Sequence, residues 1–588
     1  AEFTGDVTLL ICTDLTETIN TGIVNKSEYK LTIRPDKDEA RTITYTTATD
    51  NTGPTGVFVI GGDMTMTPGY TIGWASIPTK NVVIDGAAEG QSTPRLKITN
   101  GKWGTNVLLY GDVQNVVIKN CILVSTAAAI SNYALTFRSE NYSNTSKDIG
   151  PKNCLVENCI IESTHATKSQ AVYFQGNEAN SAAGYPTGIT IRNSNVKGHV
   201  RGMFLYGVNG LNIEGCTFDM SDMASGYLCH GIFGNIAKGV INVTGNKFIK
   251  NSTNNTNAGE YGLQTITASG GATVWVIENN YFAGYDALAS GTTTVASRLL
   301  GIRCDDSCVV RHNTFYMPKL TYAPGTALVE THAITLLWLA GSKQYPVQNN
   351  IFICEEETAN VSLIRGGLNP NVTGNVFFHN GGNAAIVAAA PSCMTFANLE
   401  TSYPAQAATS KWTNVTFTDA AKGDLSLAGS SDGDINLSVD RLDDVLTDIE
   451  GTERGEKTYA GAYEGTHFQY TVVALTNDEN KGTVSGAGAY YYGTEVTLTA
   501  MPKPGYKLLY WSDRSTENPR NITMTKNEAL SAYFVKEYVV EPTFTIEKVW
   551  ENTNVPASTN NGYQAVGWDG KIYMKDRLNA TINVYTET

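Results

Sequence analysis

Apolar and polar residues alternate in short runs along most of the chain, and one signature recurs after these runs. It consists of a β-branched pair, a spacer, Asn or Gly, then Cys or Asn, one further residue and an apolar residue, as in VVIKNCIL (116–123), NIEGCTF (212–218) and VIENNYF (276–282). Alternation with a period of two is typical of β-strands. No helical pattern of useful length separates the copies. The pattern therefore predicts an all-β fold built from a repeated unit.

The Cys/Asn position of the signature indicates the size of that unit. In chain order it is occupied by Cys121, Cys159, Ser194, Cys216, Asn246, Asn280, Asn313, Asn350 and Asn375. The irregular spacing of about 30 residues suits one coil of a β-helix with insertions at its corners. We predict that these small side chains point inward and form a hydrogen-bonded ladder along the stacked coils. Two positions on, we predict an interior stack of Leu123, Ile161, Val196, Phe218, Phe248, Phe282, Phe315, Phe352 and Phe377.

Composition narrows the class of protein. The chain has 588 residues, with 42 Lys and Arg against 56 Asp and Glu, so its formal net charge is -14. This acidic balance argues against a general nucleic-acid binder, which needs clustered cations. The chain contains no run of about 18 apolar residues, so we predict no membrane-spanning helix. Ten cysteines are too sparse for a disulfide scaffold, and the ladder interpretation makes Cys121, Cys159 and Cys216 small core residues.

Several segments carry a resemblance to known families. LTIRPDKDEARTIT (31–44), NVVIDG (81–86) and the later repeats resemble the right-handed parallel β-helix superfamily of pectate lyases, as found in large secreted proteins of Bacteroidetes-type bacteria. GDLSLAG (423–429) and GAYEG (461–465) look like the closing motif of such proteins. The resemblance implies a right-handed parallel β-helix over residues 1–465 in an extracellular or cell-surface setting. Open coil edges need caps, which we expect within 1–60 and 411–465.

The remainder of the chain predicts small β-domains. GTEVTLTA (493–500), PGYKLLYWS (504–512) and SAYFV (531–535) resemble the divergent internalin-like B-repeat, so we expect such a domain over 466–538. That resemblance implies a spacer or surface-adhesion module, with Trp511 in its core. Residues 539–588 predict a hairpin from 565–576 and 581–586, within a partial module that resembles a sorting domain or a propeller blade.

The strands that precede the ladder strands carry the candidate site. Alternation places Tyr110, Arg138, Tyr173, Gln175, Phe204, Tyr206 and Arg303 on the outer side of one sheet. With coils about 4.8 Å apart, Tyr110, Arg138, Gln175 and Tyr206 would form an outward ladder roughly 15 Å long. Aromatic faces suit sugar rings, and Arg pairs with a uronate carboxylate. The alternative is that the loops 139–153 and 176–188 cover this face.

A lyase on this fold needs a base and a cation or Arg that neutralises the uronate carboxylate. The candidate catalytic residues are Arg138, Arg303, His230 and Asp305, and the candidate substrate-binding residues are Tyr110, Tyr173, Gln175, Phe204 and Tyr206. Two motifs of polygalacturonases, NTD and RIK, are absent, and Asp305-Asp306 comes after LCHGIFG (228–234) rather than before it. The Asp305-Asp306 pair fits a turn before a strand better than a catalytic pair. His312 occupies the Asn/Gly position of the signature, which favours a structural role.

The spacing of His and Cys residues gives little support for a metal site. No histidine has metal-ligand spacing, and Cys304 with Cys308 lacks a partner pair for zinc. The acidic run 440–451 could bind calcium (Ca2+), or it could form a solvated cap at the end of the solenoid.

Two functions remain open. The first is a secreted β-helix protein that binds, and as a lyase cleaves, a polysaccharide with acidic sugars. The second is a non-catalytic surface adhesin or structural rod attached at the cell surface. Release of unsaturated oligosaccharides from polygalacturonate, alginate or a glycosaminoglycan would discriminate between them.

Overall fold

The structure is a computed structural model. The described residues run from 4 to 537, with gaps at 18–20, 47–55, 63–75, 102–103, 127–131, 141–148, 165–168, 177–183, 223–228, 251–259, 267–272, 285–286, 289–293, 296–298, 320, 323–326, 329–333, 340–345, 358–360, 367–370, 382–386, 390–391, 395 and 467, and they include three strands after residue 563.

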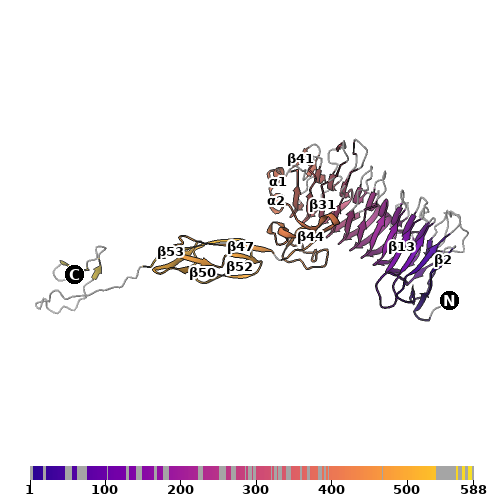
Figure 1. Ribbon diagram of the computed structural model, residues 1–588, viewed down its shortest axis with the longest axis horizontal. Coiled ribbons are helices and arrows are strands. Elements are labelled where there is room, and N and C mark those ends of the chain that lie inside the picture. The colour runs from indigo at the N-terminus through magenta and orange to yellow at the C-terminus, as the bar shows by residue number, and fades with distance from the viewer. Residues whose placement is uncertain are drawn as a thin grey trace. The chain divides into compact units, whose positions relative to one another are not determined.

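The predicted all-β parallel β-helix is confirmed. Consecutive coils stack with parallel, in-register strands, and each complete coil contributes one strand to each of three faces (Figure 1). Face 1 contains β3 (Thr21–Ile23), β6 (Gly56–Ile60), β10 (Gly104–Tyr110), β14 (Asn132–Arg138), β17 (Ser169–Gln175), β20 (Arg201–Glu214), β22 (Cys229–Thr244), β24 (Glu260–Thr265), β29 (Leu299–Cys304), β34 (Ile334–Leu339), β37 (Val361–Gly366) and β40 (Val387–Ala389).

Faces 2 and 3 complete each coil. Face 2 contains β1 (Val7–Ile11), β4 (Leu31–Pro35), β8 (Val82–Asp85), β12 (Val117–Lys119), β15 (Leu155–Glu157), β18 (Thr187–Arg192), the second halves of β20 and β22, β25 (Thr273–Glu278), β30 (Ser307–Arg311), β35 (Val347–Gln348) and β38 (Val372–Thr373). Face 3 contains β2 (Leu15–Glu17), β5 (Arg41–Tyr45), β9 (Leu96–Asn100), β13 (Cys121–Ser125), β16 (Ile160–Ser163), β19 (Asn195–Gly198), β21 (Thr217–Asp219), β23 (Lys247–Lys250), β26 (Tyr281–Gly284), β31 (Thr314–Met317), β36 (Ile351–Cys354), β39 (Val376–His379) and β42 (Lys411–Trp412).

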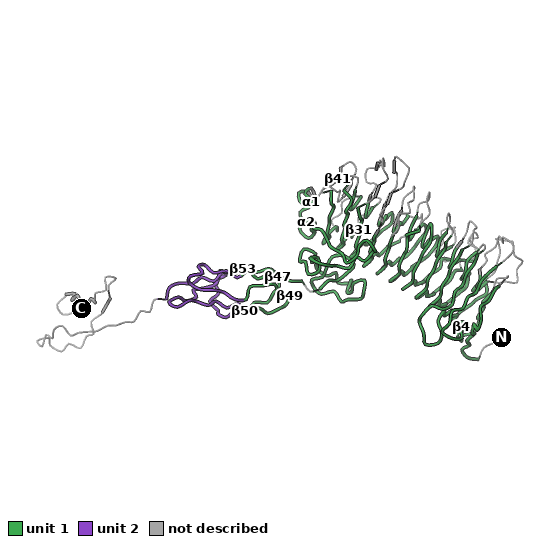
Figure 2. The backbone as a smooth tube through the Cα atoms, in the orientation of Figure 1, with its two compact units in different colours: residues 1–473, 486–497, 521–529 green, residues 474–485, 498–520, 530–588 purple. Residues whose placement is uncertain are grey.

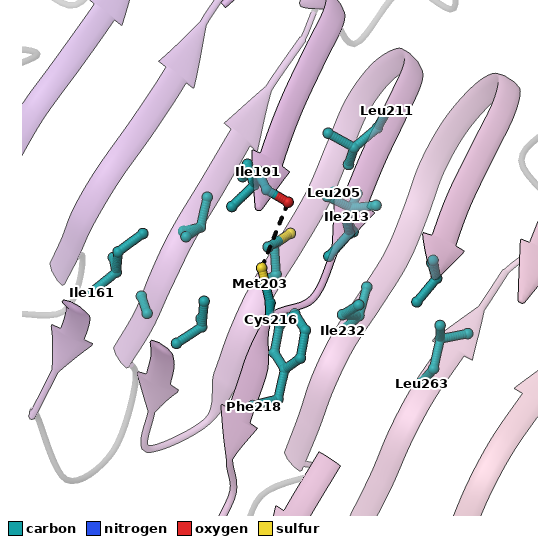
Figure 3. Close-up of a cluster of buried hydrophobic side chains, with 14 of the residues drawn as sticks. Ile161, Ile191, Met203, Leu205, Leu211, Ile213, Cys216, Phe218, Ile232 and Leu263 are labelled. Atoms are coloured by element: carbon teal, nitrogen blue, oxygen red, sulfur yellow. Dashed lines mark hydrogen bonds between the residues drawn. The ribbon is translucent and has the colours of Figure 1, made fainter. Parts of the chain in front are cut away.

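The predicted inward ladder is present between faces 2 and 3. Asn280 donates from Nδ2 to Asn313 Oδ1 at 2.9 Å, and Asn313 donates in the same way to Asn350 at 3.0 Å. The buried thiol of Cys216 donates to the carbonyl of Ile191 at 3.5 Å, within the apolar core (Figure 3). The ladder therefore satisfies backbone and side-chain polar groups that the coil corner buries.

The residue before each ladder position makes the turn. It adopts a left-handed backbone conformation with φ between 50° and 68°, at Asn120, Asn158, Asn193, Gly215, Gly245, Asn279, His312, Asn349 and Gly374. Only Gly and, less readily, Asn adopt this conformation at low cost. This requirement explains the Asn or Gly of the signature.

The predicted aromatic stack fills the interior. The rings from Phe218 to Phe377 lie 4.5 to 5.4 Å apart with interplanar angles of 3° to 10°. Glycines on face 1 make room for four of them. A Cβ atom at Gly202, Gly231, Gly262 or Gly301 would lie 2.5 to 3.0 Å from the ring of the same coil.

The ends of the solenoid differ from the predicted caps. Residues 7–11, 15–17 and 21–23 form the strands β1, β2 and β3, which belong to the coils. At the other end α1 (Phe396–Ser402) and α2 (Pro404–Thr409) follow the antiparallel pair β40 and β41 (Ser392–Met394) (Figure 1). Leu399 of α1 is fully buried in the core, so these helices close the end.

Residues 417–465 do not cap that end. We call them the return segment, because they lie along the corner between faces 2 and 3. Asn279 donates to the carbonyl of Thr447 at 2.8 Å, and Arg311 pairs with Asp444 at 2.8 Å. The segment includes the pairs β43 (Phe417–Asp419) with β44 (Asp424–Leu427) and β45 (Ser438–Asp440) with β46 (Lys457–Tyr459).

The chain divides into two compact units (Figure 2). The first comprises residues 1–473, 486–497 and 521–529, and the second comprises 474–485, 498–520 and 530–588. The strands after residue 468 are β47 (Gln469–Thr476), β48 (Gly482–Ser485), β49 (Gly488–Tyr491), β50 (Glu495–Pro502), β51 (Tyr506–Trp511), β52 (Arg520–Thr523) and β53 (Glu528–Lys536). Trp511 is fully buried, as predicted for a core residue. The predicted C-terminal hairpin is present as β55 (Ile572–Asp576) and β56 (Thr581–Tyr585), and β54 (Gln564–Val566) pairs with β55.

Candidate functional site on face 1

The outer side of face 1 carries the predicted site residues in registered rows. Tyr110 is the partner of Arg138, Arg138 that of Gln175, and Gln175 that of Tyr206, so the predicted outward ladder has the expected register. A second row connects Tyr173 with Phe204 and continues through Phe233, Gln264, Arg303, Trp338 and Arg365. A third row contains Tyr133, Gln170, Arg201 and His230.

The aromatic rings of face 1 stack on one another along the solenoid. Tyr173 lies between Tyr133, at a centroid distance of 4.6 Å, and Phe204, at 5.3 Å. Phe204 in turn stacks on Phe233 at 5.4 Å. Both faces of the Tyr173 and Phe204 rings are therefore covered by other rings. The prediction that these two residues offer open ring faces to a sugar is wrong, because each ring is stacked on both sides.

Two predicted site residues are buried. Tyr110 is only 3% exposed and packs with Val59 and Leu108 in a small apolar cluster on the outer side of the sheet. His230 is 1% exposed, and its Nε2 lies 2.7 Å from Oε1 of Gln264. The prediction that Tyr110 offers its ring to a polysaccharide is therefore wrong, because the ring is buried against neighbours in the sheet. The predicted cover by the loops 139–153 and 176–188 falls largely outside the described residues.

Arg303 and Asp305 bind each other. Nε of Arg303 lies 3.0 Å from Oδ1 of Asp305, which follows β29 in the turn before β30. The guanidinium groups of Arg303 and Arg365 each lie 4.2 Å from the ring centre of Trp338, a cation–π arrangement. Asp305 thus lies in a turn before a strand, as predicted, and its carboxylate orients Arg303.

Arg201 lies against two aromatic rings of this face. Its guanidinium lies 4.5 Å from the ring centre of Phe204 and 4.7 Å from that of Phe233. Among the described residues no acid pairs with Arg201, and its Nε is buried without a hydrogen-bond partner. Burial lowers the pKa of this guanidinium from its ordinary value. An anionic ligand would supply the missing partner and offset that desolvation.

The sequence alone predicted only some of the residues that make up these rows. Tyr133, Phe233, Trp338 and Arg365 were not among the predicted site residues, although they share rows with those that were. Strict alternation failed because Gly202 and Met203 both face the core, so residues before Gly202 have the opposite phase.

The described residues contain no group of three His, Cys, Asp or Glu side chains that could hold a metal ion. In the run 440–451, Asp444 pairs with Arg311 and Glu450 pairs with Lys247. Asp448 accepts from the backbone of Glu450, Thr452 and Glu464. No helix in the described part of the chain is long and apolar enough to cross a membrane.

The comparisons with known proteins identify one part of the chain. Residues 471–537 match the family of divergent InlB B-repeat domains, which agrees with the resemblance predicted for 466–538. No curated protein and no solved structure was found to match the chain. The B-repeat match is compatible with a surface or adhesin-like role, and it covers a small part of the chain.

Proposed function

We propose that this chain is a secreted or cell-surface protein whose β-helix binds an acidic polysaccharide along face 1. Four arginines on that face support the proposal: Arg138, Arg201, Arg303 and Arg365. They lie together in a chain with a formal net charge of -14. A local strip of cations attracts a polymer with repeated anionic groups, whereas the rest of this acidic surface would repel it.

The spacing of these arginines suits a polymer. They belong to the coils of β14, β20, β29 and β37, which are two, three and two coils apart. At about 4.8 Å per coil, their strands are separated by roughly 10 to 14 Å along the solenoid axis. Arg303 and Arg365 share one row, whereas Arg138 and Arg201 lie in the rows on either side of it, so the cations form a broad strip. A polysaccharide that follows the solenoid axis would present carboxylate or sulfate groups at recurring intervals along this strip. Arg donates two parallel hydrogen bonds to such groups.

Binding without cleavage fits the site residues best. Elimination from a uronate needs an accessible base close to the sugar. On the described part of face 1, Asp305 is paired with Arg303, and His230 is buried against Gln264. The B-repeat match supports the same adhesin-like role. Edges of Tyr173 and Tyr206 would then supply hydroxyl groups for hydrogen bonds with sugar hydroxyls.

Affinity electrophoresis tests this proposal. We expect the protein to be retarded in gels that contain polygalacturonate, alginate or a glycosaminoglycan, and to migrate normally with a neutral glucan. Arg201→Ala should reduce the retardation, while Arg192→Ala on face 2, which removes an ion pair with Glu157, should not. Equal migration in acidic and neutral gels would contradict the proposal. Release of ultraviolet-absorbing products from any of the acidic polymers would show that the protein is a lyase and not only a binding protein.

A further inference from the structure

The return segment leaves a hollow against the outer side of face 3. Its volume is about 550 Å³, within the range of about 300 to 1,000 Å³ that is usual for small-ligand pockets. Lys247 of β23 and Tyr281 of β26 line it from the solenoid. The side chains from the return segment that matter here are Asp424, Ser426, Glu450 and Tyr463.

Two tyrosine hydroxyls of this hollow lack a partner. Tyr281 is only 3% exposed and Tyr463 is 8% exposed, although Tyr281 stands on the outer side of its sheet. Their ring centres lie 6.0 Å apart. Within the described part of the chain neither hydroxyl makes a hydrogen bond. Buried polar groups are nearly always paired, so these two hydroxyls point to a ligand that pairs with them.

Carboxylates lie close to both hydroxyls. Burial, and then the charges of Asp424 and Glu450, raise the pKa of Tyr281 above its ordinary value. Burial and the neighbouring Tyr281, followed by the same two carboxylates, raise the pKa of Tyr463. Both hydroxyls therefore stay protonated at neutral pH and can donate a hydrogen bond.

The wall of the hollow combines donors with acceptors. Nζ of Lys247 donates to Glu450 at 2.9 Å, and Oγ of Ser426 donates to Asp424 at 2.6 Å. No cation among the described residues pairs with Asp424. Carboxylates outnumber ammonium groups in the lining, with Asp424, Asp448, Glu450 and Glu464 against Lys247 and Lys422.

We propose that this hollow binds a neutral sugar unit, such as a monosaccharide or the end of a neutral glycan. A sugar hydroxyl both donates and accepts, so it can bridge a tyrosine hydroxyl and a carboxylate. An acidic sugar would place its charge beside Asp424 and Glu450. An ammonium ligand would meet Lys247 and would offer no acceptor to the tyrosine hydroxyls.

This site differs from face 1 in its residues and in its ligand. None of the face 1 arginines lines the hollow. The inference therefore does not rest on the proposed binding of an acidic polysaccharide.

Saturation-transfer NMR of the full chain tests the proposal, with glucose, galactose, mannose and xylose as neutral probes and galacturonate and glucosamine as charged ones. We expect transfer to a neutral sugar, and at least about tenfold weaker binding of that sugar by the Tyr281→Phe/Asp424→Asn double variant. Tyr281→Phe alone should keep the wild-type melting temperature, because the hydroxyl that it removes has no partner within the described part of the chain.

Two controls should leave the affinity for the neutral sugar unchanged. Tyr29→Phe removes the hydroxyl of a tyrosine that is 44% exposed and lies outside the hollow. Arg201→Ala changes face 1 only, so its loss of sugar binding would move the site to that face and overturn the proposal.

The proposal would also fail if no neutral sugar received saturation, if only galacturonate or glucosamine did, or if the double variant bound as tightly as the wild type. A lower melting temperature for Tyr281→Phe would mean that this hydroxyl serves the fold, which contradicts its assignment to a ligand.

Discussion

At the scale of single residues, the solenoid depends on a few side chains that are repeated once per coil. The inward amides form an unbroken chain from Asn246 through Asn280, Asn313 and Asn350 to Asn375, with side-chain hydrogen bonds of 2.9 to 3.0 Å. Each amide also accepts from the backbone of the previous coil. A single substitution therefore affects two coils.

Asn313→Ala should be strongly destabilising. It removes the acceptor for both the backbone amide and the side-chain amide of Asn280, which are buried. We expect a loss of about 3 kcal/mol, the cost of leaving such groups unsatisfied. Thermal and denaturant unfolding measure it. Asn212→Ala, which removes one half-buried acceptor on face 2, is the control and should cost about 1 kcal/mol or less; equal losses would refute the ladder's role.

Gly262→Ala tests the fit between faces 1 and 3. The new methyl group would lie 2.5 Å from the Phe282 ring and 2.7 Å from the carbonyl of Gly301. Since backbone as well as ring must shift, we expect destabilisation of about 1 to 3 kcal/mol. Gly5, which has nothing near its Cβ position, is the matched site for a harmless alanine. If the Gly262→Ala protein had the wild-type melting temperature, the Phe stack would be packed loosely enough to accept a methyl group, contrary to this prediction.

His312 predicts a pH dependence. Burial, and then the nearby Arg454, lower the pKa of His312 well below its usual range. Its Nε2 accepts a hydrogen bond from the Asn349 amide, which requires the neutral ring. The unfolded chain takes up a proton here near pH 6.5 and the folded one does not, so stability falls as pH decreases below about 6.5.

The variant His312→Asn isolates this contribution. Asparagine already occupies the same left-handed turn at Asn279 and Asn349, so the fold should tolerate it. We expect its melting temperature to fall less than that of the wild type between about pH 7.5 and pH 5. Parallel pH profiles for the two proteins would mean that His312 titrates normally in the folded state.

At the scale of elements, the return segment is fastened by one buried cation. The side chain of Arg454 is fully buried, pairs with Glu464 at 2.5 Å and donates to Asn279 Oδ1 at 2.9 Å. It connects the segment to the corner of a coil far away in sequence. Burial lowers the pKa of Arg454 and raises that of Glu464, so neither charge is stable without the other.

Arg454→Met should release the return segment. The substitution leaves Glu464 buried without its partner, at an expected cost of about 3 kcal/mol. We expect proteases to cleave within 417–465 under conditions that leave the wild type intact. The exposed pair of Arg95 with Asp38 is the control, and Arg95→Met should leave the stability close to that of the wild type. Resistance of the Arg454→Met segment to proteolysis would contradict the account.

The elements that could be predicted are those that the chain repeats. The ladder, the Phe stack and the register of Tyr110 with Arg138 follow from comparing copies, because each coil repeats the same environment. The return segment has no repeat, and its contacts with Asn279 and Arg311 join residues more than 130 positions apart. The stacking of Tyr173 on Phe204 was missed for another reason: alternation gives the side of a sheet, but it does not say whether a neighbouring ring covers the face.

At the scale of the whole molecule, the solenoid holds the proposed anion-binding strip on one of its faces. The stacked coils hold Arg201, Arg303 and Arg365 on one side at fixed intervals, so little flexibility is lost when a polymer binds. The match of 471–537 to B-repeat domains is compatible with a surface role for the same chain. The central claim is that the arginines of face 1 recognise an acidic polysaccharide.

Isothermal titration calorimetry with acidic oligosaccharides tests this claim most directly. The account predicts binding by the wild type that weakens with added salt, at least about tenfold weaker binding by the Arg201→Ala/Arg303→Ala double variant, and unchanged binding by Arg192→Ala on face 2. Binding that the double variant retains in full, or that Arg192→Ala reduces equally, would contradict it.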